Sequence, residues 1–163
     1  MTQPWASLLV AGANCIETRS WNTKYRGAVA IHAAAGFPAH AKALCAASPY
    51  REALAAAGFH AAADLPTGQF IGLADLDDVL ACDAATAATI RRQSRDGTLP
   101  PHELDFGDFS AGRFGFVMAR MAPLTTAIPA RGMLSLWNVA PAVEEQILAA
   151  ADSVVGAPPV VPV

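Results

Sequence analysis

The residues best suited to chemistry lie close together near the start of the chain, where polar and aromatic side chains interrupt an alanine-rich sequence. At the two-residue period of a strand, Glu17, Arg19 and Trp21 fall on one face. Residues 28–33 have the pattern of a second strand, and His32 lies near its end. The segment therefore predicts that a carboxylate, a guanidinium, an indole and an imidazole converge on two neighbouring strands.

This combination of side chains is suited to catalysis or to a purely structural role. Glu17 and His32 could act as base and acid on a ribose phosphate, while Arg19 or Arg113 holds the phosphate. They are therefore the predicted catalytic residues if the protein is an enzyme. In the structural alternative, Glu17 and Arg19 pair with each other, or with Arg113 and Asp108, because half-buried charges need partners.

Neither a metal site nor a cofactor site is predicted. His40 and His60 have no third ligand at metal-binding spacing, so we expect both to face solvent. The acidic patch at residues 75–78 lacks the glycine and glutamate of a calcium loop and predicts a bend or bulge in a long strand. Cys15 has no second signal of a nucleophile, and we expect it to behave as a small buried hydrophobe.

The composition indicates a folded protein that carries little charge. Of its 163 residues, 53% are hydrophobic and 15% are charged, which is enough for one domain with its own core. Only eleven Lys and Arg residues and a net charge of −3 disfavour extended duplex DNA as a partner. No membrane-spanning apolar run and no secretory signal are visible. Three scattered cysteines without CxxC spacing predict reduced thiols in a cytoplasmic protein, monomeric by default.

The elements that must position the polar residues alternate between helices and strands. Proline and glycine mark helix ends at Pro4 and Gly12, and Asp83 and Gly97 bracket another helix. Composition alone therefore predicts a mixed α+β domain. The predicted helices cover residues 4–11, 36–59 (as a pair), 83–95 and 141–151, and the predicted strands cover 15–21, 28–33, 69–82, 113–121 and 133–139, with a loop at 122–132.

Several sequence blocks occur in an order that resembles a known family. They are Gly-x-x-x-Ile-Glu-x-Arg-Ser-Trp at 12–21, Tyr-Arg-Gly-x-x-x-Ile-His at 25–32, Phe-Gly-Asp-Phe-Ser-x-Gly-Arg-Phe at 106–114, and Pro-Ala-Arg-Gly at 129–132 followed by Leu-Trp at 136–137. Together the blocks resemble the ASCH domain, a branch of the PUA-like superfamily. The resemblance implies a PUA-like β-pseudo-barrel decorated with short helices over residues 1–155, and we expect a flexible tail at 156–163.

The resemblance also implies a cleft between the barrel and a helix, lined by polar residues. Four arginines accompany two acids in the matching blocks, which leaves positive charge for an anion, and Trp21 and Tyr25 could stack on a base. We therefore expect the ligand to be a single-stranded RNA or a nucleotide, which could be modified. The predicted ligand-binding residues are Glu17, Arg19, Trp21, Lys24, Tyr25, Arg26, His32, Asp108, Arg113 and Arg131.

Two other classes of function stay open. Some similar proteins hydrolyse an amide on acetylated cytidine with a lysine and a threonine, whose positions hold Asn14 and Glu17 here. Asparagine cannot transfer a proton at neutral pH, and glutamate does not replace a hydroxyl nucleophile. A small hydrolase of a modified nucleoside or RNA would therefore need another mechanism, such as that of a nuclease. The third class is an interaction module that docks a protein segment on the helical insertion at 36–59.

Overall fold

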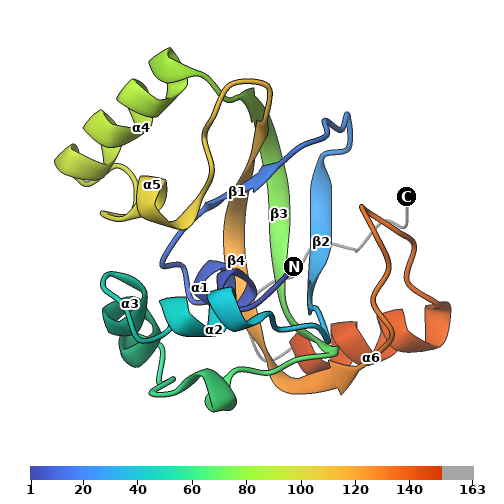
Figure 1. Ribbon diagram of the computed structural model, residues 1–163. Coiled ribbons are helices and arrows are strands. Elements are labelled where there is room, and N and C mark those ends of the chain that lie inside the picture. The colour runs from blue at the N-terminus through green and yellow to red at the C-terminus, as the bar shows by residue number, and fades with distance from the viewer. Residues whose placement is uncertain (152–163) are drawn as a thin grey trace.

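A four-stranded antiparallel sheet forms the centre of the computed structural model, which describes residues 1–151. Its strands follow the order β1-β4-β3-β2, and helices lie around them (Figure 1). This arrangement confirms the predicted α+β class, and the predicted tail lies outside the described residues. The strands are β1 (Ile16–Arg19), β2 (Gly27–Ala33), β3 (Gln69–Ala81) and β4 (Phe114–Pro129).

The helices are short and lie in three groups around the sheet. In Figure 1, α4 and α5 lie together at the upper left, α1, α2 and α3 lie in the lower half, and α6 lies at the lower right. Asp83 caps α4 by accepting a hydrogen bond from the Thr86 amide at 2.7 Å, and Gly97 ends it in the left-handed conformation, as predicted. The helices are α1 (Trp5–Val10), α2 (Ala39–Leu44), α3 (Tyr50–Ala56), α4 (Ala84–Asp96), α5 (Glu103–Phe106) and α6 (Pro141–Ala151), with a 3-10 turn, η1 (Ala62–Asp64).

The hydrophobic residues gather into three cores. The first packs α1 against β2, β3 and β4 and contains Ile31, Leu76 and Phe116. The second joins α1, α3 and α5, and the third packs α6 against β3 and β4. Residues 70–76 of β3 are all buried, because this strand contributes to the first core and to the third.

The prediction that β1 and β2 are neighbours is wrong, because β4 and β3 lie between them. The two edge strands nevertheless line one pocket, which contains Glu17 from β1 and His32 from β2. Met1 lies at the gap, where its amino group donates a hydrogen bond to the His32 carbonyl at 2.6 Å and its carbonyl accepts one from the Ala34 amide at 2.7 Å. The predicted convergence is thus achieved by closure of the sheet around a core, without direct pairing.

The long strands β3 and β4 contain the irregularities that such closure needs. Their register shifts between Phe70 and Gly72, between Leu73 and Asp75, and between Leu76 and Asp78, and bulges increase the local twist of a sheet. The acidic patch at 75–78 lies at two of these shifts, which confirms the predicted bulge.

Two predicted boundaries near the end of the chain are wrong. The predicted loop at 122–132 largely belongs to β4, which continues to Pro129. The prolines of β4 are tolerated because its pairing with β3 is irregular there: Phe70 pairs with Ile128, and Gly72 pairs with Pro123. The predicted strand at 133–139 is not a strand. Its alternating pattern fails because Leu134 is 93% exposed and Ser135 has a positive φ of 61°.

A buried carboxylate that sequence analysis missed holds the start of β1. Glu103, at the beginning of α5, is fully buried. It accepts hydrogen bonds from the backbone amides of Cys15 at 3.0 Å and Ile16 at 2.7 Å. Burial nevertheless raises the pKa of Glu103, and these hydrogen bonds oppose that rise. Glu103 therefore supplies acceptors for edge-strand amides that no neighbouring strand pairs.

We expect Glu103→Gln to destabilise the protein by about 1–3 kcal/mol, the cost of leaving a buried donor without a good acceptor. Glu103→Ala should cost more, because both amides then lose their acceptor. Urea denaturation would measure both losses, with Glu52→Gln on the exposed face of α3 as the control. Unchanged stability of Glu103→Gln would contradict the anchoring role.

Candidate functional site

Two hollows lie on either side of β1, and Glu17 lines both of them. We call the larger one, of about 350 Å³, the outer cleft. We call the smaller one, of about 70 Å³, the barrel pocket. The outer cleft is lined by Trp5, Glu17, Thr18, Tyr50, Asp105, Phe106, Gly107, Asp108 and Arg113. The barrel pocket is lined by Met1, Glu17, Arg19, Trp21, Val29, Ala30, Ile31, His32, Phe116, Met118, Ser135, Leu136 and Trp137.

Aromatic rings from three helices form one wall of the outer cleft. Tyr50 of α3 contacts Trp5 of α1 edge to face, with ring centroids 6.2 Å apart, and contacts Phe106 of α5 at 4.9 Å. The Tyr50 hydroxyl donates a hydrogen bond to the Asp105 carbonyl at 2.9 Å. Tyr50 and Phe106 are buried, whereas Trp5 is half-buried. Trp5 is therefore the ring of this wall with the most surface left for a ligand.

Polar groups from β1 and from the loop after α5 form the opposite wall. The Asp108 amide donates to Thr18 Oγ1 at 3.0 Å, and Arg113 donates to the carbonyls of Asp108 at 3.1 Å and Thr18 at 3.3 Å. Arg113 also pairs with the Asp108 carboxylate at 3.3 Å. Gly107 permits this close approach, because a Cβ there would lie 2.6 Å from the Phe109 ring. The wall is therefore held in place before any ligand binds.

The barrel pocket contains a partly buried ion pair. Arg19 lies 3.1 Å from Glu17, and the two side chains are 34% and 13% exposed. Burial raises the pKa of Glu17, while Arg19, the amino group of Met1 and Arg113 oppose that rise. Burial also lowers the pKa of the Met1 amino group to about 6, and Arg19 adds to the effect. The Glu17 carboxyl thus lies near groups that favour its ionised form, but its burial disfavours that form more strongly.

His32 is packed into the wall of the barrel pocket. It is 5% exposed, and its ring lies edge to face with Phe70 at 5.1 Å and Trp137 at 5.9 Å. Nε2 lies 2.9 Å from the Ala130 carbonyl. Trp21 packs in the same way, edge to face with Phe116 at 5.0 Å. Because 70 Å³ holds a few waters and no nucleotide base, neither ring stacks on a ligand in this conformation.

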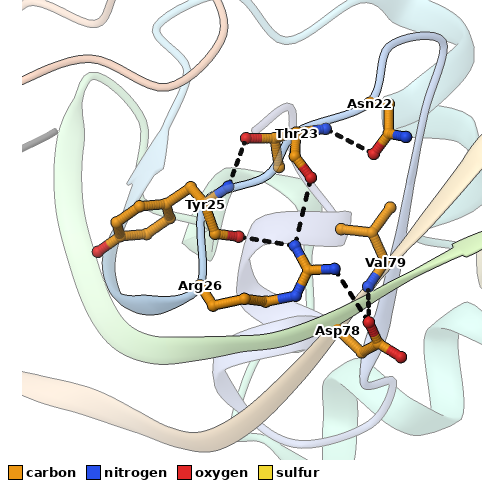
Figure 2. Close-up of polar contacts among 6 residues, drawn as sticks. All are labelled: Asn22, Thr23, Tyr25, Arg26, Asp78 and Val79. Carbon is orange, nitrogen blue, oxygen red and sulfur yellow. Dashed lines mark hydrogen bonds and ion pairs between the residues drawn. The ribbon is translucent and has the colours of Figure 1, made fainter.

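Tyr25 and Arg26 form a separate cluster in the loop before β2 (Figure 2). Arg26 pairs with Asp78 at 2.9 Å and donates to the carbonyls of Tyr25 at 2.8 Å and Thr23 at 3.2 Å. The Tyr25 hydroxyl donates to the Ala28 carbonyl at 2.6 Å. Asp78 lies outside the matching sequence blocks, so the comparison of arginines with acids did not include it. Its pairing with Arg26 reduces the predicted surplus of positive charge.

The structure thus divides the predicted ligand-binding residues among four places. Glu17, Asp108 and Arg113 line the outer cleft, and Glu17, Arg19, Trp21 and His32 line the barrel pocket. Lys24, Tyr25 and Arg26 belong to the loop before β2, and Arg131 is exposed after β4. The predicted acid–base pair, Glu17 and His32, shares the barrel pocket.

Sequence analysis missed the aromatic wall of the outer cleft. Trp5 lies outside the matching blocks, and Tyr50 lies in the helical insertion, far from those blocks in the sequence. Phe106 and Gly107 were inside a matching block, which was the one signal available for this wall. The cleft could not be recognised without knowing that α1, α3 and α5 pack together.

The thiol and the other histidines considered in the sequence have no catalytic or metal-binding arrangement in the described structure. Burial and Glu103 raise the pKa of Cys15 to about 12, so the thiol stays protonated and donates to Glu103 at 3.5 Å. His40 and His60 are exposed, as predicted. Among residues 1–151, no group of three or more His, Cys, Asp or Glu side chains could hold a metal ion. No helix in that range is long and apolar enough to cross a bilayer.

The raised pKa of Glu17 predicts how stability responds to pH. Because the folded pKa exceeds the unfolded value of 4.5, the folded state binds more protons between these two pKa values. Wild-type protein should therefore lose stability relative to Glu17→Gln as the pH rises above 4.5. At neutral pH, Glu17→Gln should cost less than about 1 kcal/mol, because Arg19 is partly hydrated. Melting curves from pH 4 to 7 would measure the difference.

The exposed Glu145→Gln on α6 is the control for this pH series, since it should stay parallel to wild type. If the free energy of unfolding of Glu17→Gln instead falls by about 3 kcal/mol at neutral pH, the carboxylate is required to neutralise Arg19 in the folded protein.

Comparison with known proteins identifies the family to which the chain belongs. A family model, the ASCH domain, matches residues 1–100. Activating signal cointegrator 1 from Homo sapiens is 29% identical over 137 residues, which cover 84% of this chain and 21% of that protein. The Mus musculus protein of the same name is 29% identical over 139 residues, covering 85% and 21%. This chain spans about a fifth of the length of these relatives. The chain belongs to the ASCH domain family, and its fold is PUA-like.

Proposed function

We propose that the protein binds a short single-stranded RNA or a nucleotide, modified or not, in the outer cleft. The observation that carries the proposal is a cleft of about 350 Å³ whose lining combines aromatic rings with polar groups. Small-molecule sites typically have volumes of about 300–1,000 Å³, so a nucleoside-sized group fits. The family's association with RNA supports the same class of ligand.

Each wall of the outer cleft suits one part of a nucleotide. The half-buried indole of Trp5 offers a face or edge to a base, which is how proteins commonly hold unpaired bases. Arg113 and Thr18 line the same cleft, where a guanidinium and a hydroxyl can bond a base edge or a ribose hydroxyl. Arg113 is fixed by its bonds to the Asp108 and Thr18 carbonyls, so little conformational freedom is lost on binding.

A hydrolase acting on a modified nucleoside or RNA is the second candidate, and the position of Glu17 favours it. This carboxyl lines both hollows, and burial raises its pKa, as is common for catalytic acids. Turnover of RNA or modified nucleosides that is lost in Glu17→Gln and kept in Cys15→Ala would support this function. No product from wild-type protein would leave binding as the function.

We further propose that the protein is a cytoplasmic monomer and that the domain covers residues 1–155. The three free cysteines support a reducing compartment.

Two tryptophans provide a matched test of the proposed binding site. Trp5→Leu should weaken binding of a short labelled oligonucleotide on the order of tenfold, because stacking on one base contributes about 1–3 kcal/mol. Trp21→Leu should leave the affinity per folded molecule unchanged, because that indole packs on Phe116 inside the barrel. Fluorescence anisotropy would give the affinities, and circular dichroism would give the folded fraction of each variant.

The site would have to be moved to the barrel pocket if Trp21→Leu weakened binding more than Trp5→Leu. Negligible binding by wild-type protein at low salt would refute the proposed function.

A further inference from the structure

A third polar hollow lies beside the outer cleft, between α4 and α5. It has a volume of about 320 Å³, and we call it the α4 cleft. Asp105 of α5 lines both the α4 cleft and the outer cleft, so the two hollows meet at this residue. The α4 cleft is lined by Arg91, Ser94, Arg95, Pro101, Leu104 and Asp105.

Two arginines supply positive charge to the α4 cleft. Arg91 and Arg95 are four residues apart on α4, so they lie on the same face of the helix. Both are exposed, and within residues 1–151 neither forms an ion pair. The helix dipole accounts for a cation at Arg95 in the last turn. It does not account for Arg91, one turn earlier, facing the same hollow.

A hydroxyl group lies between these cations. Ser94 lines the α4 cleft, and its Oγ is buried without a hydrogen-bond partner among the described residues. A buried hydroxyl normally finds a partner, and a phosphate oxygen is a suitable acceptor. The acid in the cleft, Asp105, is already bonded by His102 Nδ1 at 2.9 Å. The cleft therefore presents two cations, its one carboxylate is already engaged, and the Ser94 hydroxyl in its lining is left unsatisfied.

We propose that the α4 cleft holds a backbone phosphate of the nucleotide that follows or precedes the one in the outer cleft. This inference rests on the proposed function, and it makes an RNA strand of several nucleotides the ligand, in preference to a single nucleotide. In protein–nucleic acid interfaces, base contacts usually give specificity and phosphate contacts fix the position of the strand. The outer cleft would supply the base contacts, and the α4 cleft would supply the phosphate contacts. The strand would pass over α5 at Asp105, where the two hollows meet.

The test compares oligouridylates of increasing length with uridine monophosphate on three variants. Arg91→Gln/Arg95→Gln should weaken binding of an oligomer of about eight nucleotides on the order of tenfold and reduce its salt slope by about 0.7 for each lost phosphate contact. The affinity for uridine monophosphate should not change. Arg92→Gln, on the same helix but outside the cleft, is the matched control and should bind like wild type. Arg91→Lys/Arg95→Lys should restore most of the salt slope.

The outcomes separate this inference from the proposed function. If wild type binds the oligomer and the double glutamine variant binds it equally well, the α4 cleft has no role and only this inference fails. The same holds if Arg92→Gln loses as much affinity as the double variant, which would indicate a general charge effect.

If wild type binds no RNA at any length, both proposals fail. Titration with inorganic phosphate, followed by the amide resonances of Ser94 and Arg95, gives an independent readout. A cleft that binds inorganic phosphate while the double variant keeps its oligomer affinity would be an anion site unrelated to RNA, and this too would overturn the inference.

Discussion

The register of β1 is the constraint on which both hollows depend. This strand has four residues and lies at an edge of the sheet. Its pairing with β4 fixes one side, and Glu103 accepts the amides at its start. A slip of one residue would exchange the faces of the strand. Thr18 would then leave the outer cleft and Arg19 would leave the barrel pocket, so one buried carboxylate from a distant helix determines what each hollow contains.

Closure of the sheet explains why the barrel pocket is charged but small. β1 and β2 lie at opposite edges and still line one pocket, with Met1 between them. Packing of His32 against Phe70 and Trp137 fills most of that space. A carboxylate and a guanidinium enclosed in this way chiefly satisfy each other. The outer cleft has the larger volume and is therefore better suited to a ligand of nucleoside size.

The sequence predicted most of the fold because the fold depends on local signals. Strand alternation located β2 and β3, and Asp83 and Gly97 located the ends of α4. The predicted strand at 133–139 failed for a tertiary reason, since no neighbouring strand pairs with it and Leu134 faces solvent. Local pattern shows what a segment could form, and burial decides whether it does.

The candidate site was only partly predictable, because its members meet through long-range packing. Arg26 is neutralised by Asp78, which is 52 residues away in the sequence, and no periodicity indicates such a pair. Trp5 and Tyr50 come together only when α1 packs on α3. Counting charges along the chain therefore overestimated the surplus in the matching blocks, while Arg91 and Arg95 of α4, which form no ion pair within residues 1–151, lie outside those blocks. An acidic protein can still bind a phosphate backbone if a few cations without acidic partners line its path, and in residues 1–151 that condition is met where the outer cleft meets the α4 cleft.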